Sequence, residues 1–189
     1  MKIGAVLLAS GLGRRFGSNK LLTAVEGIPL YRRAMTALAG AGFDRLTVCS
    51  PYQEVLSAGE ALGFLPLYNP DYAQGISASV RLGAAGMSGM DGALFSVCDQ
   101  PFLTTESIIK LKNAFTESKT AICALSWQGQ RGNPVLFPAD LFGELAALTG
   151  DKGGGVVVKR HPHRLVLVEA ASPRELADVD TPADLPVQK

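Results

Sequence analysis

A glycine-rich basic segment, Ser10–Lys20 (S-G-L-G-R-R-F-G-S-N-K), follows the first apolar run of the chain. Its three glycines let the backbone curl closely around a ligand, as a loop that binds an anion through its amides requires. The spacing G-x-G-x-x-x-G is one residue longer than the dinucleotide fingerprint, and the P-loop pattern is absent. Arg14, Arg15 and Lys20 carry more charge than a pyrophosphate held by backbone amides needs, so the segment predicts a nucleoside triphosphate site. The alternative is a surface turn whose basic residues are merely solvated.

A carboxylate stands at the end of a second strand-like run, where the apolar residues 92–98 stop at Asp99-Gln-Pro-Phe. In open α/β sheets, ligands bind beyond the carboxyl ends of the strands, so this segment and the basic loop are predicted to share one site. Magnesium is usually held by one or two carboxylates together with substrate oxygens, which makes Asp99 a candidate metal ligand. Because Pro101 follows at turn spacing, an aspartate that only caps a turn is the alternative.

Tryptophan, histidine and cysteine residues elsewhere do not predict a second site. Trp127 suits a stacking role on a flat ring, although a lone tryptophan at a strand end is more often part of a core or a rim. His161 and His163 have no nearby cysteine or third histidine and predict a solvated turn. The three cysteines lie far apart in apolar runs, without a C-x-x-C pair, which indicates buried free thiols.

The elements that must position these residues alternate between strand and helix. Continuous apolar runs predict strands buried on both faces, and stretches of helical period predict the helices between them. Strands are expected at 3–9, 46–49, 64–67, 92–98, 121–127, 133–137 and 165–168, helices at 29–41, 51–62, 75–86, 104–115 and 139–148, a hairpin turn at 128–132 and a loop at 149–155. The pattern predicts an α/β, three-layer, Rossmann-like fold whose mostly parallel sheet has a mixed extension.

Composition limits the class of protein. A chain of 189 residues with 47% hydrophobic and 19% charged residues predicts a single globular domain. Its net charge of +1 provides no global field for a nucleic-acid backbone or an anionic bilayer, so neither partner is expected and any anion site must be local. The first apolar run is too short for a membrane span and lacks the pattern of a secretory leader, so a cytoplasmic protein is expected.

Residues 8–20 (L-A-S-G-L-G-R-R-F-G-S-N-K) resemble the L-A-[AG]-G-x-S-x-R-[MF]-G-x-x-K signature of the MobA-like nucleotidyltransferases. Further segments extend the resemblance in order over nearly the whole chain, at 75–79, 98–102, 132–137, 150–153 and 178–185. Within the family they are most similar to the molybdenum cofactor cytidylyltransferases. Two positions depart from the pattern: Gly13 replaces the usual Ser, which removes one hydroxyl contact to a phosphate, and Ser10 replaces Ala or Gly.

The resemblance implies a fold of the nucleotide-diphospho-sugar transferase type and a Mg²⁺-dependent reaction. A phosphate of a molybdopterin-type acceptor would attack the α-phosphorus of CTP, and pyrophosphate would leave. Such a reaction depends on positioning and on neutralising the departing charge. By resemblance, the catalytic residues are Arg15 and Lys20, which would hold the triphosphate, and Asp99, which would hold the metal.

The same resemblance assigns the remaining site residues. Nucleotide contacts are expected from Ala9, Ser10, Gly11, Leu12, Gly13, Arg14, Lys20, Gly75, Ser77 and Ser79. Acceptor contacts are expected from Gln100, Asn133, Asp151 and Lys152, and a second metal contact from Asp180. Two of these assignments have structural alternatives. Residues 181–184, next to Asp180, also form a good helix start, and Ser77 and Ser79 are also ordinary helix N-caps.

Residues 1–189 are expected to form one domain, with a nucleotide-binding part at about 1–103 and an acceptor-binding part at about 104–189. GTP or another triphosphate, another phosphorylated acceptor, and an NAD(P)H-dependent reductase of the nicotine blue type are the alternatives. The charged first loop argues against a nicotinamide dinucleotide, as does the lack of an acidic residue after the second strand. A silent binding module is a further alternative. The leading function also implies a transient contact with a molybdoenzyme or its chaperone.

Overall fold

A seven-stranded sheet forms the centre of the protein in the computed structural model, which describes residues 1–11, 20–179 and 181–184. The strands are β1 (Ile3–Leu8), β4 (Arg45–Ser50), β5 (Leu65–Tyr68), β6 (Gly92–Val97), β7 (Ile122–Trp127), β8 (Gln130–Pro138) and β9 (Leu165–Glu169), in the spatial order β5-β4-β1-β6-β8-β7-β9. All neighbours pair in parallel except β8, which is antiparallel to both β6 and β7. The predicted mostly parallel sheet with a mixed extension is confirmed.

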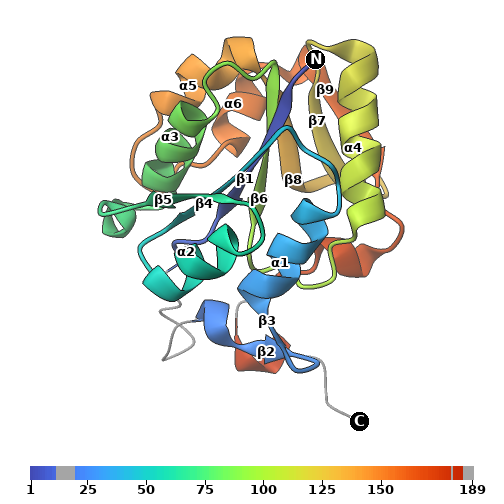
Figure 1. Cartoon of the computed structure of the whole chain (residues 1–189). Coiled ribbons are helices and arrows are strands. Elements are labelled where there is room, and N and C mark those ends of the chain that lie inside the picture. The colour runs from blue at the N-terminus through green and yellow to red at the C-terminus, as the bar shows by residue number, and fades with distance from the viewer. Residues whose placement is uncertain (12–19, 180, 185–189) are drawn as a thin grey trace.

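Helices cover both faces of the sheet (Figure 1). One face packs against α1 (Leu30–Ala39), α2 (Gln53–Glu60) and α4 (Thr105–Ser118), and the other against α3 (Ile76–Gly86), α5 (Phe142–Ala146) and α6 (Gly155–Arg160). Side chains of β1 alternate between the two cores: Leu7 lies in the first and Val6 in the second. A strand buried on both sides explains why β1 is a continuous apolar run. None of these helices is long and apolar enough to cross a membrane, within the part of the chain that the structure describes.

Several boundaries differ from the sequence-based prediction. The hairpin of β2 (Ala24–Val25) and β3 (Ile28–Pro29) was not predicted; its turn residues Glu26 and Gly27 both have positive φ, as a two-residue hairpin turn requires. The second hairpin turn is shorter than predicted, because Gln128 and Gly129 alone adopt positive φ. The predicted helix at 139–148 is a 3₁₀ turn followed by α5, and α6 was not predicted. That 3₁₀ turn is η3 (Ala139–Leu141), and the other 3₁₀ turns of the described residues are η1 (Lys20–Leu22), η2 (Tyr72–Gln74), η4 (Pro162–Arg164), η5 (Pro173–Leu176) and η6 (Pro182–Asp184).

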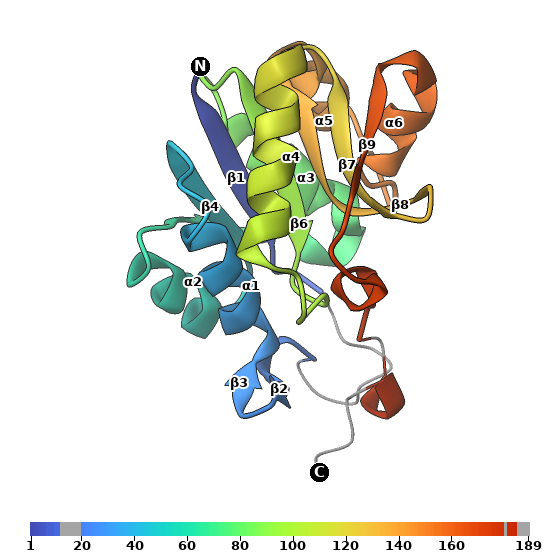
Figure 2. The same ribbon diagram turned by 90° about the vertical axis from the view of Figure 1, so that its right-hand side faces the viewer.

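The β2–β3 hairpin and the segment that carries η5 and η6 project beyond the carboxyl ends of β1 and β6 (Figure 2). Val25 and Val179 share a small apolar cluster with Phe102, which follows β6. Arg33 on α1 connects the same segments: its Nε donates to the carbonyl of Val25 at 2.9 Å and its Nη1 to that of Pro101 at 3.4 Å. One side chain of α1 therefore holds both the hairpin that follows Lys20 and the loop that follows Asp99.

A buried carboxylate, Glu175 in η5, fastens this segment to the start of α4. It accepts hydrogen bonds from Thr104 N at 3.1 Å, Thr104 Oγ1 at 2.7 Å and Ala171 N at 2.8 Å. Burial alone would raise the pKa of Glu175, but these hydrogen bonds outweigh it, and the pKa lies below its ordinary value of 4.5. The charged form of Glu175 therefore stabilises the fold at pH values above 4.5, and this stabilisation is lost as the pH falls through the lowered pKa of Glu175.

Glu175→Gln is expected to lower the free energy of unfolding by about 2 kcal/mol at pH 7, since hydrogen bonds to a charged group contribute about 1.5–3 kcal/mol. Urea denaturation at a series of pH values measures this difference, which should shrink below pH 4.5 as the wild-type carboxylate becomes protonated. Glu106→Gln, on the exposed side of the first turn of α4, serves as the control and should change stability by less than about 0.5 kcal/mol. A difference for Glu175→Gln that is constant with pH would contradict this role of the charge.

Candidate functional site

The carboxyl ends of β1, β4 and β5 form the base of the site. Ser10, just after β1, donates its hydroxyl hydrogen to the carbonyl of Cys49 at 3.1 Å. Asn69, directly after β5, donates from Nδ2 to Ser10 Oγ at 3.2 Å and to Ser79 Oγ at 3.0 Å. The unusual serine at position 10 thus helps to fix the start of the basic loop. Asn69 was missed in the sequence, because it follows a short and largely exposed edge strand, whereas Asp99 follows a buried apolar run.

The start of α3 lies against the loop that precedes α6. Gly75 has a φ of 103°, and a Cβ there would lie 2.4 Å from Asp151 Oδ1 and 2.6 Å from the carbonyl oxygen of Gly150. Ser77 N donates to the same carbonyl at 3.2 Å. Gly75 is therefore required both for its backbone conformation and for this close approach. A segment predicted to bind the nucleotide and a loop predicted to bind the acceptor are in direct contact.

Ser77 and Ser79 lie inside α3 and are buried. Gly75 occupies the N-cap position of this helix, so the alternative that the serines are N-caps is wrong. Ser77 Oγ accepts from Arg81 Nη1 at 3.2 Å, and Ser79 Oγ accepts from Asn69. The hydroxyls hold neighbouring side chains in place, and their contact with a nucleotide stays a prediction.

Lys20 and Asp99 form an ion pair across the carboxyl edge of the sheet, with 3.0 Å between Nζ and Oδ2. The side chains are 12% and 28% exposed, which places the pair at the surface of the site and not in the core. The carbonyl of Asp99 accepts from Val179 N at 2.8 Å. The end of β6, the end of the basic loop and the C-terminal segment therefore meet at one point, as predicted for the first two.

The other carboxylate oxygen of Asp99, Oδ1, is buried and has no hydrogen-bond partner among the described residues. No backbone amide of that part of the chain donates to this carboxylate, so the turn-capping alternative gains no support. The bond to Val179 N brings Asp178, the residue before it, close to Asp99. The described residues contain no cluster of three or more His, Cys, Asp and Glu side chains. Asp99 and the nearby Asp178 therefore fit a divalent ion that is held by one or two carboxylates, with substrate oxygens as its other ligands.

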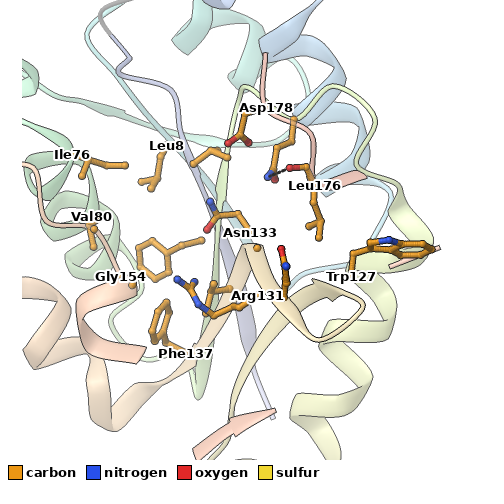
Figure 3. A pocket seen from close by; sticks show the side chains of 18 of the residues that line it. Leu8, Ile76, Val80, Trp127, Arg131, Asn133, Phe137, Gly154, Leu176 and Asp178 are labelled. Carbon is orange, nitrogen blue, oxygen red and sulfur yellow. Dashed lines mark hydrogen bonds between the residues drawn. The ribbon is translucent and has the colours of Figure 1, made fainter. Parts of the chain in front are cut away.

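A cavity of about 570 Å³ adjoins this point and extends over β8. Its described apolar and aromatic lining comes from Leu8, Ile76, Val80, Phe95, Val97, Trp127, Val135, Phe137, Pro173 and Leu176, and its polar lining from Gln100, Gln130, Arg131, Asn133 and Asp178. Figure 3 shows the side chains of Arg131 and Asn133 directed into the cavity, with Asp178 at its upper margin. An apolar cavity with a few polar groups that point inward is the usual form of a small-molecule site.

The structure separates the predicted acceptor residues. Gln100 and Asn133 line the cavity, whereas Asp151 and Lys152 are exposed and are not among its described lining residues. The three glycines that follow them, at 153–155, do line it.

Five predicted site residues lie outside the described part of the chain: Leu12, Gly13, Arg14, Arg15 and Asp180. Thr181 and η6 form a capped 3₁₀ turn, in which Asp184 accepts from Thr181 N at 2.7 Å and from its hydroxyl at 2.9 Å, and the role of Asp180 as a metal ligand stays a prediction.

The tryptophan and histidine residues lie at the margin of the site or away from it. Trp127 is half-buried, packs against the core and extends away from Asn133 at the edge of the cavity (Figure 3). His161 Nε2 lies 2.5 Å from Glu144 Oε1, a contact that joins α6 to α5. Hydrogen bonds from His161 and then Arg160 hold the pKa of Glu144 below its ordinary value.

The three cysteines are buried free thiols, as predicted. Burial raises the pKa of Cys49 to about 12 and that of Cys123 to about 11. Cys98, directly before Asp99, is also buried, and burial raises its pKa well above the ordinary value. A thiol that stays protonated is a poor nucleophile, so these residues belong to the core and not to the chemistry of the site.

Two curated relatives resemble the chain in different ways. The nicotine blue oxidoreductase of Paenarthrobacter nicotinovorans is 24% identical over 188 residues, which cover 95% of this chain and 92% of the relative. The probable molybdenum cofactor guanylyltransferase of Bacillus licheniformis is 32% identical over 124 residues, which cover 65% of this chain and 61% of the relative.

The fold has similar solved structures. The crystal structure of Rv0371c from Mycobacterium tuberculosis H37Rv is 28% identical with a TM-score of 0.81, covering 97% of this chain and 96% of that one. A complex of the same protein with manganese is 27% identical with a TM-score of 0.78 and the same coverage. The MobA-like NTP transferase domain matches residues 5–165, which include both members of the ion pair, Lys20 and Asp99. From this match, the chain belongs to the MobA-like NTP transferase family and is a nucleotidyltransferase.

Proposed function

We propose that this protein transfers CMP from CTP to a molybdopterin-type acceptor and releases pyrophosphate, with Mg²⁺ held at Asp99. The observation that carries the proposal is the contact between Lys20 and Asp99, which are 79 residues apart in sequence and 3.0 Å apart at the carboxyl edge of the sheet. A cation and a carboxylate at this place suit a triphosphate and a divalent ion. The crystal of Rv0371c with manganese, at 27% identity, supports a divalent ion in this family.

The reaction asks little covalent chemistry of the chain. A phosphate oxygen of the acceptor forms a bond to the α-phosphorus, the bond from that phosphorus to the bridging oxygen of the β-phosphate breaks, and pyrophosphate leaves with the added negative charge. Lys20 would hold the triphosphate and offset the charge that develops on the leaving group. A divalent ion, when bound, would neutralise phosphate oxygens beside Asp99. Arg15, outside the described residues, is proposed as a second cation for the same phosphates.

The choice of CTP over GTP rests on the small residues at the start of α3. Their sequence resembles the cytidylyl branch, and they adjoin the Ser10–Asn69–Ser79 hydrogen bonds, where the nucleoside would lie against backbone and short polar groups. The relative from Bacillus licheniformis, a probable guanylyltransferase, favours GTP as the competing substrate.

The cavity beyond β6 supports a heterocyclic acceptor. Its wall of leucine, valine and phenylalanine side chains suits the face of a flat ring system, and Asn133 and Arg131 supply polar contacts at one side. Asp151 and Lys152, on the exposed loop before α6, would contact the phosphate end of such an acceptor. The cavity takes lining residues from both expected parts of the chain, before and after residue 103.

The test combines the purified protein with Mg²⁺, each nucleoside triphosphate in turn and molybdopterin, and measures pyrophosphate. Pyrophosphate should form only when CTP, metal and acceptor are all present. Formation with GTP in place of CTP would contradict the assigned nucleotide, and formation without metal would contradict the role of Asp99.

A reductase is the second candidate, because the nicotine blue oxidoreductase is similar over 95% of the chain. The same protein is therefore incubated with nicotine blue and NADPH or NADH, and the absorbance of the reduced nicotinamide is followed. If the protein is the proposed transferase, the absorbance of the reduced nicotinamide should not change. Oxidation of the nicotinamide together with no pyrophosphate in the first assay would replace the proposal.

A further inference from the structure

Gln100 presents a buried hydrogen-bond acceptor without a donor at the wall of the cavity. Its side chain lines the cavity and the residue is 3% exposed. Its Nε2 donates to the carbonyl of Leu176 at 3.4 Å, which fixes the nitrogen end of the amide toward η5. The opposite end, Oε1, is buried and has no hydrogen-bond partner among the described residues.

A buried carbonyl oxygen without a donor is unfavourable, and buried acceptors in folded proteins nearly always have a partner. The cavity lining includes side chains that carry donors, Gln130, Arg131 and Asn133, but none of the described residues donates to Oε1. The missing donor is therefore expected from a molecule that enters the cavity. Because the nitrogen of the amide is already directed to Leu176, Gln100 offers this molecule an acceptor and not a donor.

The rest of the lining distinguishes between the classes of molecule that carry a donor. A polyol or sugar would place many hydroxyl groups against the apolar side chains from β6, β8 and α3 and leave them unpaired. A planar nitrogen heterocycle buries its faces against the same side chains and presents N–H groups only along its edge. An N–H at the ring edge matches the buried Oε1 of Gln100.

We propose that Gln100 selects the acceptor substrate, by accepting at Oε1 a hydrogen bond from a ring N–H of a planar nitrogen heterocycle. The inference rests on the proposed function for the identity of the cavity as the acceptor site, and it adds the residue and the atom that recognise the edge of the acceptor ring. Gln100 is in this account a specificity residue and takes no part in the phosphoryl chemistry beside it.

The experiment compares two fluorescent probes: lumazine, which has two ring N–H groups, and 1,3-dimethyllumazine, in which methyl groups replace both N–H hydrogens. Fluorescence titration of the wild-type protein, without nucleotide, should give about tenfold tighter binding of lumazine, the effect of one unpaired buried acceptor. Gln100→Met, which keeps a similar volume and removes the acceptor, should bring the ratio of the two dissociation constants close to one. Gln100→Glu, which keeps an acceptor oxygen, should retain the preference.

The control is Gln128→Met, in the β7–β8 turn next to Trp127, which is exposed and not among the described lining residues; it should keep the wild-type ratio. Equal binding of the two probes to the wild type would overturn the inference, and so would a preference that survives in Gln100→Met, because the methyl groups would then act by bulk alone. The thermal melting temperature of each variant is measured to check that the variant folds. The comparison of the two probes on the wild-type protein does not depend on any variant. Since no triphosphate is present, a failure to turn over CTP would overturn the proposed function and leave the result for Gln100 standing.

Discussion

Replacing Asp99 with asparagine is expected to lower the rate of metal-dependent pyrophosphate release by a factor of about a hundred or more, the usual effect of losing a group that stabilises charge at a reacting phosphate. The asparagine side chain has nearly the same shape and its oxygen still accepts from Lys20, so the fold should be retained. It lacks the negative charge and has only one side-chain oxygen, so no carboxylate ligand remains beside the buried position of Oδ1. The kcat for the CTP reaction and the thermal melting temperature, measured on the same preparation, test this result.

The matched control is an aspartate at the opposite end of β6. Asp91 precedes β6 at its amino end, where its carboxylate accepts from Lys2 N at 2.6 Å, and it is exposed. Asp91→Asn should therefore keep the wild-type kcat. A second measurement, the electron paramagnetic resonance of Mn²⁺ titrated into the protein with CTP, should show weaker binding only for Asp99→Asn. Unchanged Mn²⁺ binding and unchanged turnover in Asp99→Asn would refute its role as a metal ligand.

The order of the large elements was predictable because each carries a strong local signal. The continuous run in β1 and the apolar run that ends at Asp99 identify strands buried on both faces, and Thr104 marks the start of α4 by accepting from Ser107 N at 3.3 Å. Short elements lack such signals. Helix α6 begins at Gly155 and continues with three valines, which are poor helix formers, and it is stable because Val157 and Val158 are buried against the sheet.

The order of strands beyond β6 depends on tertiary contacts that a sequence pattern does not contain. The 128–129 turn predicts that β7 and β8 pair, but either strand could have joined β6. In the structure β8 does so, with Phe95 opposite Val135, and β7 instead pairs with the edge strand β9. This arrangement brings Asn133 and Arg131 over the carboxyl end of β6, and it is the reason that the hairpin contributes to the cavity.

The sequence predicted site residues that stand at the end of a strand or a loop. It missed residues that hold the site in place by contacts with distant segments. Asp99 and Lys20 were identified from the ends of their segments, and the structure brings them together. Arg33 and Glu175 hold those segments from α1 and η5, through backbone carbonyls and amides, and nothing in their local sequence predicts these long-range contacts. Asp178 was passed over within the tail motif, although it lines the cavity.

Lys20→Met is expected to lower kcat by about a hundredfold, because the departing pyrophosphate loses a cation that offsets its charge. Stability should fall by less than about 3 kcal/mol, because the pair is largely buried, with side chains 12% and 28% exposed, and the loss of one partner of a fully buried pair costs about 3–5 kcal/mol. Lys110→Met, at an exposed position of α4, is the control and should leave both quantities unchanged. A melting temperature that falls in proportion to the lost activity would show that Lys20 only supports the structure.

The double variant Lys20→Met with Asp99→Asn separates two ways in which the pair can act. If both groups serve one assembled site for metal and triphosphate, their effects are not additive, and the double variant should be about as slow as the slower single variant. If each acts alone, the two factors multiply, to about ten thousandfold. The 3.0 Å contact and the shared position at the ends of β1 and β6 favour the first result. Turnover of the double variant near the product of the single effects would show that the contact does not couple the two groups in the reaction.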